Sequence, residues 1–396
     1  MAGVLNGIRV VEQGTFITGP CAGMMLADLG ADVIKVESPE GDPYRSYQGE
    51  QYSPHFQAYN RNKRSIALDL KESSERKLFD GLVAQADVFI QNFRPGTAAR
   101  LGAGCERLRE LNPRLIYGSI SGFGSSGPYA DRPSYDSVAQ ALSGFLSVVV
   151  DSSRPRFLGP ALADAITGIY AAYGVLGALV QRARTGVGCL VEVSMLEAMA
   201  HFAVEPFAAF FALGTTPTSS DRPRLAQAYI LRTADARLIA IHLSSLEKFW
   251  DGLVAALNAP ELARDARFNP RTARIANYEG LNEELDRRFA QHELSHWIER
   301  LERNDVPYAP INAIDEVVHD PQVQHLGLIV PVESAHGATR AVRPPVQFGG
   351  ERRESVRAAP ALDQHGAAIR DALKRDERWP DLPAEKQGEV AHEAEM

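Results

Sequence analysis

The sequence predicts an α/β protein with a large domain on a parallel sheet, helices on both faces of that sheet, and a smaller α+β domain. Two observations carry this prediction. Over the first 194 residues, short apolar stretches of strand character alternate with helix-like stretches, which is typical of parallel sheets. A turn-rich segment at 214–225 then lacks any periodic apolar face, so it marks a linker.

The first elements form a strand–helix–strand unit. Residues 8–11 and 31–37 have strand character, and residues 20–29 form the predicted helix between them, with Pro20 at its start and Gly30 after its end. Further strands are predicted at 65–70, 86–93, 114–120 and 189–194. Helices are predicted over 72–85 and 195–213, so strands and helices alternate throughout this domain.

A second domain begins after the linker. Residues 229–233 and 238–243 flank a short turn and predict a hairpin, and amphipathic helices are predicted at 246–257, 278–289 and 294–303. A strand pair near 327–332 and 340–348 and a helix over 366–374 follow. The expected bounds are therefore 1–213 for the large domain, 214–225 for the linker, 226–310 for the small domain, and 311–396 for a segment that returns to the large domain, with a polar, exposed tail over its last twenty residues.

Composition favours a cytoplasmic enzyme. The 396 residues are 45% hydrophobic and 23% charged, which is ordinary for a globular protein. A net charge of −8 gives no general footprint for nucleic acid or a membrane surface, so neither partner is expected. Gly, Asp or Arg interrupts the longest apolar runs, and the N-terminus lacks a signal-peptide pattern. Three distant cysteines suggest neither a disulfide framework nor a zinc site, and no metal is expected.

Residues 159–179 form a nearly apolar stretch with one acid in it, Asp164. The apolar residues recur at helical spacing, so the stretch is a predicted buried helix. Asp164 follows Pro160 by four residues and lies in or just before the first turn, where free N–H groups favour an ionised carboxylate. Its position alone indicates an N-cap.

Two catalytic motifs can be set aside. Residues 122–127 match the Gly-x-Gly-x-x-Gly dinucleotide fingerprint after a predicted strand. Pro128 and Pro133, however, keep the chain irregular where the phosphate-binding helix would have to begin. Ser121 and Ser125 lie on the same loop, but no Gly-x-Ser-x-Gly nucleophile elbow surrounds them.

Two basic stretches, residues 60–71 and 92–100, border strands or helix starts of the same predicted sheet. Lys71 and Arg100 are suited to phosphate contacts, and Asn92 to a hydrogen bond. Phe93 offers an aromatic face for an adenine ring. The alternative for any single cation here is a solvated surface position.

Several segments together carry a family resemblance: residues 5–12, 19–20, 29–37, 41–43, 62–66 and 92–96, and Asp164 with Gly168. In this order and spacing they resemble the class III CoA-transferases, which include formyl-CoA transferase and carnitine CoA-transferase and are related to α-methylacyl-CoA racemase. The resemblance covers nearly the whole chain and is weakest from about 205 to 300. It implies a Rossmann-like large domain built from both ends of the chain, a smaller domain between, and an interlocked homodimer.

The resemblance also implies a mechanism and its cofactor, coenzyme A, which enters as an acyl-CoA substrate. Asp164 would attack the thioester, and the released CoA thiolate would convert the mixed anhydride to an aspartyl-CoA thioester. An acceptor acid would then reverse the sequence. Backbone amides of the loop 122–127 would stabilise the oxyanions.

By position, the resemblance carries the family's CoA contacts to twelve residues: Phe16, Ile17, Ser38, Leu68, Lys71, Asn92, Phe93, Arg94, Arg100 and Leu101, with Tyr135 and Asp136. Three positions depart from the formyl-CoA transferase pattern, because Ile17 replaces a glutamine, Ser38 an arginine and Pro133 a lysine. A run of glycines near the start of the small domain is also absent. These departures argue against oxalate and formyl-CoA as substrates, but not against transferase chemistry.

A short dicarboxylate such as succinate is the family-level expectation for the acid, with Arg45, Arg61 and Arg224 as candidate partners of its carboxylates. Two other functions remain. Racemisation of 2-methylacyl-CoA needs two bases, and the position of the racemase histidine holds Tyr135, which is a poor base at neutral pH. A CoA-binding protein without activity would give no hydroxylamine-sensitive CoA adduct when acyl-CoA is added.

Overall fold

A computed structural model describes residues 3–48, 51–157, 159–244, 247–333, 339–351, 355–375 and 379. The chain divides into two units. The first comprises residues 1–143, 159–202 and 327–396, and the second comprises residues 144–158 and 203–326. The expected small domain, 226–310, lies wholly inside the second unit. That unit also takes in residues on both sides of it, including the expected linker.

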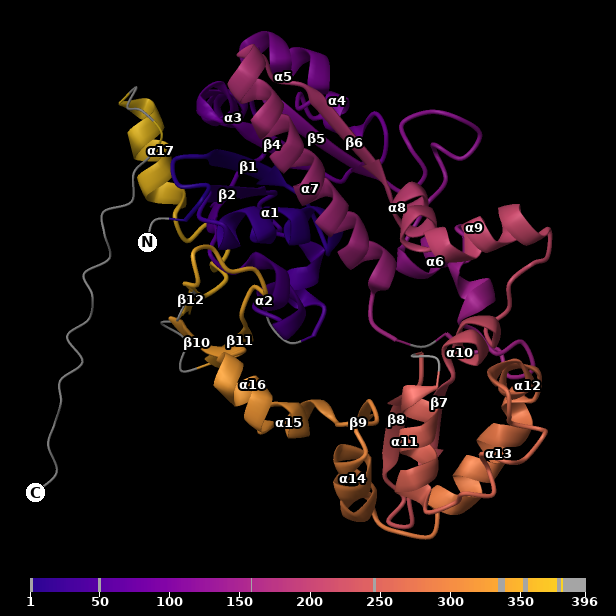
Figure 1. Ribbon diagram of the computed structural model, residues 1–396. Coiled ribbons are helices and arrows are strands. Elements are labelled where there is room, and N and C mark those ends of the chain that lie inside the picture. Colours follow the sequence, from indigo (N-terminus) through magenta and orange to yellow (C-terminus); the bar gives the residue numbers. More distant parts are fainter. Residues whose placement is uncertain are drawn as a thin grey trace, which may run out of the picture. The chain divides into compact units, whose positions relative to one another are not determined.

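The first unit is built on a six-stranded parallel sheet in the order β3-β2-β1-β4-β5-β6 (Figure 1). Its strands are β1 (Arg9–Gln13), β2 (Asp32–Glu37), β3 (Arg64–Ala67), β4 (Val88–Gln91), β5 (Ile116–Ser121) and β6 (Leu190–Ser194). This is the strand order of dinucleotide-binding folds, so the α/β prediction and its Rossmann-like form are confirmed. From β1 the strands continue to one side as β2 and β3, and from β4 they continue to the other side as β5 and β6. The strand order therefore reverses between β1 and β4.

Helices cover both faces of this sheet. On one face, α1 (Thr18–Asp28) and α7 (Leu162–Thr185) pack against strand residues such as Val10 and Ile116. On the other, α3 (Ser73–Gln85) and α5 (Cys105–Leu111) pack against the alternate residues, such as Val11 and Tyr117. Burial on both faces is why these strands are apolar runs in the sequence.

Helix α7 packs closely against α1 along small residues. A Cβ atom added at Gly168 would lie 2.7 Å from Cys21 Cβ, so only glycine allows this approach. Two stretches of the described chain are long and apolar enough to cross a bilayer. One is α7 by itself, and the other is α8 (Met195–Phe202) with α9 (Val204–Leu213), if this bent pair is counted as one span. This differs from the expectation that such runs are interrupted. For α7, packing of its small residues into the core accounts for the composition.

The end of the chain returns to the edge strand β3. Asp363 Oδ1 accepts a hydrogen bond from Ala67 N at 2.8 Å, and His365 Nδ1 accepts one from Ser65 N at 3.1 Å. Helix α17 (Gly366–Lys374) packs on α3. A small sheet of β10 (Ile329–Glu333), β11 (Thr339–Val342) and β12 (Val356–Arg357) precedes it. Apart from Trp379, the predicted polar tail lies outside the described residues.

The second unit contains the predicted hairpin, β7 (Ala228–Arg232) and β8 (Leu238–His242), extended by β9 (Tyr308–Pro310) into an antiparallel sheet. Its core is formed with α11 (Lys248–Leu257), α13 (Tyr278–Phe289) and α14 (Leu294–Arg303). The remaining helices are short: α2 (Pro54–Asn60), α4 (Thr97–Arg100), α6 (Asp136–Leu142), α10 (Asp221–Ala226), α12 (Arg271–Ala276), α15 (Ile314–Val317) and α16 (Pro321–Leu326), with 3-10 turns η1 (Pro43–Ser46) and η2 (Phe145–Val148).

Two element predictions were wrong. The predicted helix 195–213 is two helices, because the chain bends by 66° between α8 and α9. The predicted linker contains the helix α10, which the density of turn residues in that segment conceals. Ser220 precedes this helix, and Asp221 lies in its first turn, where an acid favours helix formation.

Candidate active site

The carboxyl ends of β1 and β4 meet where the strand order reverses, which is the usual ligand site of parallel α/β sheets. A cavity of about 240 Å³ opens there. Residues 15–18 after β1 and 92–95 after β4 line it, together with residues 120–122 at the end of β5. Residues Ala130, Arg132, Ser134, Tyr135, Asp164 and Met195 complete the wall.

Asn92 holds the two loops at this point together. Its Nδ2 donates to Thr15 O and to Thr18 Oγ1, both at 2.8 Å, and its Oδ1 accepts from Thr15 N at 2.9 Å. Both N–H groups of the amide are therefore engaged within the protein. The side chain of Asn92 fixes the shape of the cavity, and this leaves little of its hydrogen-bonding capacity for a ligand.

A buried charge network lies under the loop after β1. Lys35 Nζ lies 3.0 Å from both Glu12 Oε1 and Asp42 Oδ2, and Lys63 Nζ lies 2.5 Å from Glu12 Oε2. Two cations thus balance two anions, as burial requires. Asp42 Oδ1 also accepts a hydrogen bond from Phe16 N at 3.1 Å. The network therefore fixes the loop that forms one wall of the cavity.

Phe16 adopts a left-handed backbone conformation, with φ of 58°, which is unfavourable for a bulky side chain. Such strain gathers at functional sites when the surroundings enforce it. The conformation brings the Phe16 ring edge-on to Tyr135, with 6.2 Å between ring centroids, and 5.7 Å from Tyr44. The left-handed turn therefore gives the cavity an aromatic wall.

Asp164 is the third residue of α7, and it does not cap the helix. The cap is Asp136, whose Oδ1 accepts hydrogen bonds from Ala163 N at 2.7 Å and from Asp164 N at 3.3 Å. Among the described residues, no hydrogen bond or ion pair reaches the Asp164 carboxylate. The N-cap interpretation of Asp164 is therefore wrong. Asp136, 28 residues earlier, takes that role, and spacing along the chain cannot reveal it.

The surroundings of Asp164 raise its pKa to about 7. Burial is the larger cause, since an apolar cluster of Ile17, Cys21 and Tyr44 adjoins the start of α7, and the nearby Asp136 carboxylate adds to it. The expectation that the helix terminus keeps this carboxylate fully ionised is therefore wrong. Burial thus leaves the ionised form of this carboxylate poorly solvated.

Six of the residues assigned to CoA by resemblance line the cavity with Asp164: Phe16, Ile17, Asn92, Phe93, Arg94 and Tyr135. The other six are not among the residues that line it: Ser38, Leu68, Lys71, Arg100, Leu101 and Asp136, the last of which caps α7. Ser38 directly follows β2 and Leu68 follows β3, so both lie at the same edge of the sheet. The Leu68 side chain is in the core and offers only its backbone. These contacts with CoA stay predictions.

The expected carboxylate partners are already paired. Arg45 is buried and donates to both carboxylate oxygens of Glu37, at 2.7 and 2.8 Å. Arg61 likewise binds Asp28, and Arg224, in the second unit, binds Asp221. The three expected partners therefore already neutralise acids of the protein itself.

Two other cations line the cavity, Arg94 and Arg132, and within the described part of the chain neither has a carboxylate partner. The Arg132 guanidinium lies 4.4 Å from the centre of the Tyr129 ring. Sequence reasoning missed Arg132, although it lies three residues from Tyr135. The cavity thus offers two cations for anionic groups of a substrate.

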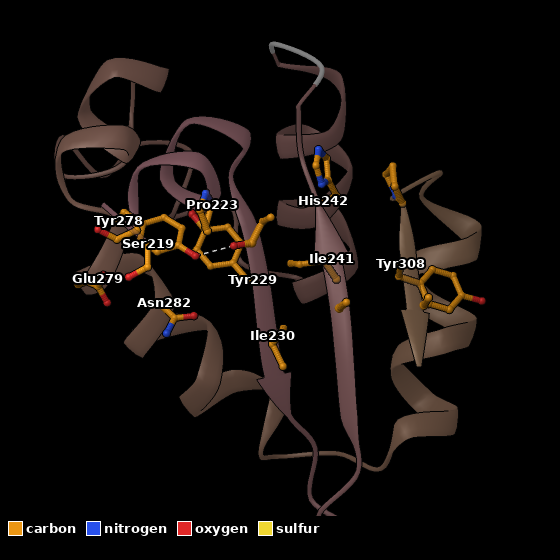
Figure 2. A pocket seen from close by; sticks show the side chains of 15 residues that line it. Ser219, Pro223, Tyr229, Ile230, Ile241, His242, Tyr278, Glu279, Asn282 and Tyr308 are labelled. Atoms are coloured by element: carbon orange, nitrogen blue, oxygen red, sulfur yellow. Dashed lines mark hydrogen bonds between the residues drawn. The ribbon is translucent and has the colours of Figure 1, made fainter. Parts of the chain in front are cut away.

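A larger hollow, of about 690 Å³, lies in the second unit against β7, β8 and β9. Figure 2 shows Ser219, Tyr229 and Tyr278 gathered beside β7, with the Tyr278 hydroxyl donating to Ala228 O. Its walls are mostly apolar, and Glu279 is the acidic residue among those that line it. The smaller cavity differs from this hollow in bringing together an acid with a raised pKa, Asp164, and two cations.

Comparison with known proteins gives one family. The chain matches the family described as CoA-transferase family III over residues 5–366. It is 36% identical to the succinate–glutarate CoA-transferase of Agrobacterium fabrum, over 94% of this chain and 96% of that protein. It is 33% identical to the acetyl-CoA:oxalate CoA-transferase of Acetobacter aceti, over 93% and 95% of the two chains.

A solved structure is similar over the same length. The CaiB/BaiF family protein from Brucella suis superimposes with a TM-score of 0.84 at 35% sequence identity. The match covers 94% of this chain and all of that one. The relatives named for their activity and the solved structure are thus similar over nearly their full lengths.

Proposed function

Because this chain belongs to CoA-transferase family III, we propose that it moves CoA from an acyl-CoA to a free carboxylic acid with Asp164 as the nucleophile. Family membership makes the protein a CoA-transferase. The role of Asp164 rests on one observation. It is a carboxylate without a hydrogen-bonding partner among the described residues, in a cavity at the point where the strand order reverses.

The reaction balances without a net change in protons or redox state. An oxygen of Asp164 attacks the thioester carbonyl, the C–S bond breaks, and CoA leaves as the thiolate from a mixed anhydride. The thiolate then attacks the aspartyl carbonyl carbon and releases the first acid, which leaves an aspartyl-CoA thioester. The acceptor carboxylate runs the same steps in reverse and leaves with CoA, so Asp164 is regenerated.

The surroundings of Asp164 support this role in two ways. Burial removes water that would solvate the carboxylate and would also hydrolyse the anhydride and the thioester. Asp136 occupies the first N–H groups of α7, so these do not hold the attacking oxygens of Asp164. Asp164 is therefore positioned by its backbone, while its carboxylate is left to react.

The substrate acid is proposed to be a short dicarboxylate. Relatives at 33–36% identity are named for succinate, glutarate and oxalate. Arg94 and Arg132 supply the positive charge that a second carboxylate and the phosphates of CoA would need. Screening acyl-CoA donors against paired dicarboxylic and monocarboxylic acids of equal chain length, with mass spectrometry of the product thioesters, tests this proposal.

Replacing Asp164 tests the nucleophile. We expect Asp164→Ala to lower turnover by on the order of a thousandfold or more, because the covalent route is lost. The wild-type protein should form a hydroxylamine-sensitive CoA adduct after acyl-CoA is added, and the variant should not. Asp151→Ala is the matched control, since Asp151 is exposed, does not line the cavity, and bonds to Ser153 and Arg154 within its own turn. Near-normal transfer by Asp164→Ala would rule out the assignment.

A homodimer is proposed with this function, as the family resemblance implies. Large apolar side chains are exposed on helices in both units. Tyr173 on α7 is 72% exposed, and Phe211 on α9 is 77% exposed. Exposed apolar surface of this kind is typical of a protein–protein contact.

A further inference from the structure

One hydroxyl in the wall of the Asp164 cavity is buried without a partner. Ser134 Oγ is inaccessible to solvent and makes no hydrogen bond within the described part of the chain. Buried hydroxyls in proteins nearly always have a partner, so an exception needs an explanation. Ser134 lines the same cavity as Asp164, so rotation of its side chain about the Cα–Cβ bond would present the covered hydroxyl to a bound substrate, which can supply the missing partner.

The place of Ser134 is fixed from two sides. A Cβ atom added at Gly122 would lie 2.4 Å from Ser134 Cβ and 3.0 Å from Ser134 Oγ, so the glycine makes room for the serine. Two residues after Ser134, Asp136 caps α7 by accepting from Ala163 N and Asp164 N. The backbone of Ser134 is therefore held relative to the backbone of Asp164.

The other polar side chains that line the cavity are occupied more fully. Ser121 Oγ accepts a hydrogen bond from Gly124 N at 2.9 Å. Both N–H groups of Asn92 are donated to Thr15 and Thr18. Among the uncharged polar side chains described in this wall, Ser134 is thus the one whose hydroxyl is fully buried and donates no hydrogen bond.

We propose that Ser134 is a catalytic residue of CoA transfer, whose hydroxyl donates a hydrogen bond to the carbonyl oxygen of the thioester that Asp164 attacks. The proposal rests on the function proposed above. As the C–O bond from Asp164 forms, negative charge gathers on that carbonyl oxygen until the C–S bond breaks. The Ser134 proton stays on its own oxygen throughout, and the bond strengthens as the charge grows.

Kinetics of Ser134→Ala give the first test. Loss of one such donor is expected to lower kcat by on the order of 10- to 100-fold, with a smaller effect on the KM for acyl-CoA. The kcat of Ser134→Cys, in which a weaker donor of similar shape replaces the hydroxyl, should lie between the kcat of wild type and that of Ser134→Ala. Ser152→Ala, at an exposed serine outside the cavity, should behave as wild type. A kcat of Ser134→Ala within twofold of wild type would overturn the proposal.

Binding of two unreactive acyl-CoA analogues separates catalysis from a structural role. One is the ketone in which CH₂ replaces the thioester sulfur, and the other is the alkyl thioether, which has no carbonyl. Ser134→Ala should weaken binding of the ketone about tenfold, the size of a lost hydrogen bond, and leave the thioether unchanged. Equal weakening of both, or no change in either, would contradict a contact with the carbonyl oxygen.

These binding measurements need no turnover, so their outcome does not depend on Asp164. If Asp164 is not the nucleophile, the aspartyl-CoA adduct is absent from the wild-type protein, while Ser134→Ala still weakens binding of the ketone and not of the thioether. If only the Ser134 assignment fails, the adduct forms normally, and Ser134→Ala causes no selective loss of ketone binding. The two failures are therefore distinguishable.

Discussion

Asp136, the first residue of α6, and Asp164, in the first turn of α7, have different tasks. Asp136 carries a structural charge that satisfies the first N–H groups of α7. Asp164 carries the proposed nucleophilic carboxylate, in surroundings that raise its pKa. The two acids are linked, because the Asp136 charge contributes to the raised pKa of Asp164. This division of tasks predicts how activity depends on pH and how each substitution changes that dependence.

We expect kcat/KM for the acyl-CoA half-reaction to fall below about pH 7, because only the ionised Asp164 can attack and its pKa is about 7. The decline should approach tenfold per pH unit at lower pH. Formation of the aspartyl-CoA adduct at a series of pH values measures it without an acceptor acid. An acid limb near pH 4, where ordinary aspartates titrate, would contradict the raised pKa.

Asp136→Asn should shift this acid limb to lower pH, since the neighbouring negative charge is removed. The shift should be partial, because burial is the larger cause and remains. The asparagine amide keeps an oxygen that can accept from Ala163 N, so the helix cap survives. Asp136→Ala removes the cap as well and should also lower stability by about 1 kcal/mol in urea unfolding. An unmoved acid limb in both variants would show that Asp136 does not influence Asp164.

At the scale of elements, contact between α1 and α7 sets the place of Asp164. The contact is close because Gly168, one turn after Asp164, has no side chain to separate the two helices. Cys21 and Thr18 of α1 lie where a side chain at this position would be. Thr18 is also held by Asn92, so a shift of α1 would disturb the cavity directly.

Gly168→Ala should therefore destabilise the protein by about 1–3 kcal/mol, as overpacked cores do, and lower kcat as well. Gly177→Ala in the same helix is the control, because nothing lies within 4 Å of a Cβ atom there. That change should stabilise the protein by about 0.5–1 kcal/mol, since alanine favours helix. Urea unfolding of both variants gives the comparison. Equal stability of the two would show that the approach of α1 does not need the glycine.

The elements also show what the sequence can predict. All six strands of the large sheet were located, because burial on both faces leaves apolar runs in the inner strands, and apolar residues alternate with polar ones in the edge strand β6. The 66° bend between α8 and α9 was missed, although Pro206, in the first turn of α9, is a signal for a new helix start. The ion pairs that Arg45 and Arg61 form within the protein were not predicted either. Pairing with Glu37 and Asp28 is a property of the folded chain, which charge patterning along the sequence does not encode.

The site was predictable to a similar extent. Asp164 and the residues after β1 and β4 were identified from the resemblance and lie around one cavity. The cap by Asp136 and the buried hydroxyl of Ser134 were not predicted as such. Both depend on contacts between segments far apart in the chain, and a single sequence contains no record of those contacts.

At the scale of the whole molecule, the proposed homodimer gives a prediction. Light scattering after size-exclusion chromatography should report twice the mass of one chain. Phe211→Asp should shift the protein toward the monomer, because a charge would replace an exposed ring in the apolar surface of α9. Glu283→Lys, on the exposed side of α13, is the control for a change of surface charge. A wild-type protein that is monomeric at micromolar concentration would contradict the proposal.

The return of the chain end to β3 also has a consequence during synthesis. The outer N–H groups of β3 at Ser65 and Ala67 bond to His365 and Asp363, which follow about 300 residues later. At about 5–20 residues per second, a ribosome needs about 15–60 s to make that interval. The sheet edge therefore stays unpaired while that interval is made, and an unpaired edge is a site where other chains can add. A late segment thus closes the first sheet, so we expect nascent chains that stall before residue 363 to depend on chaperones.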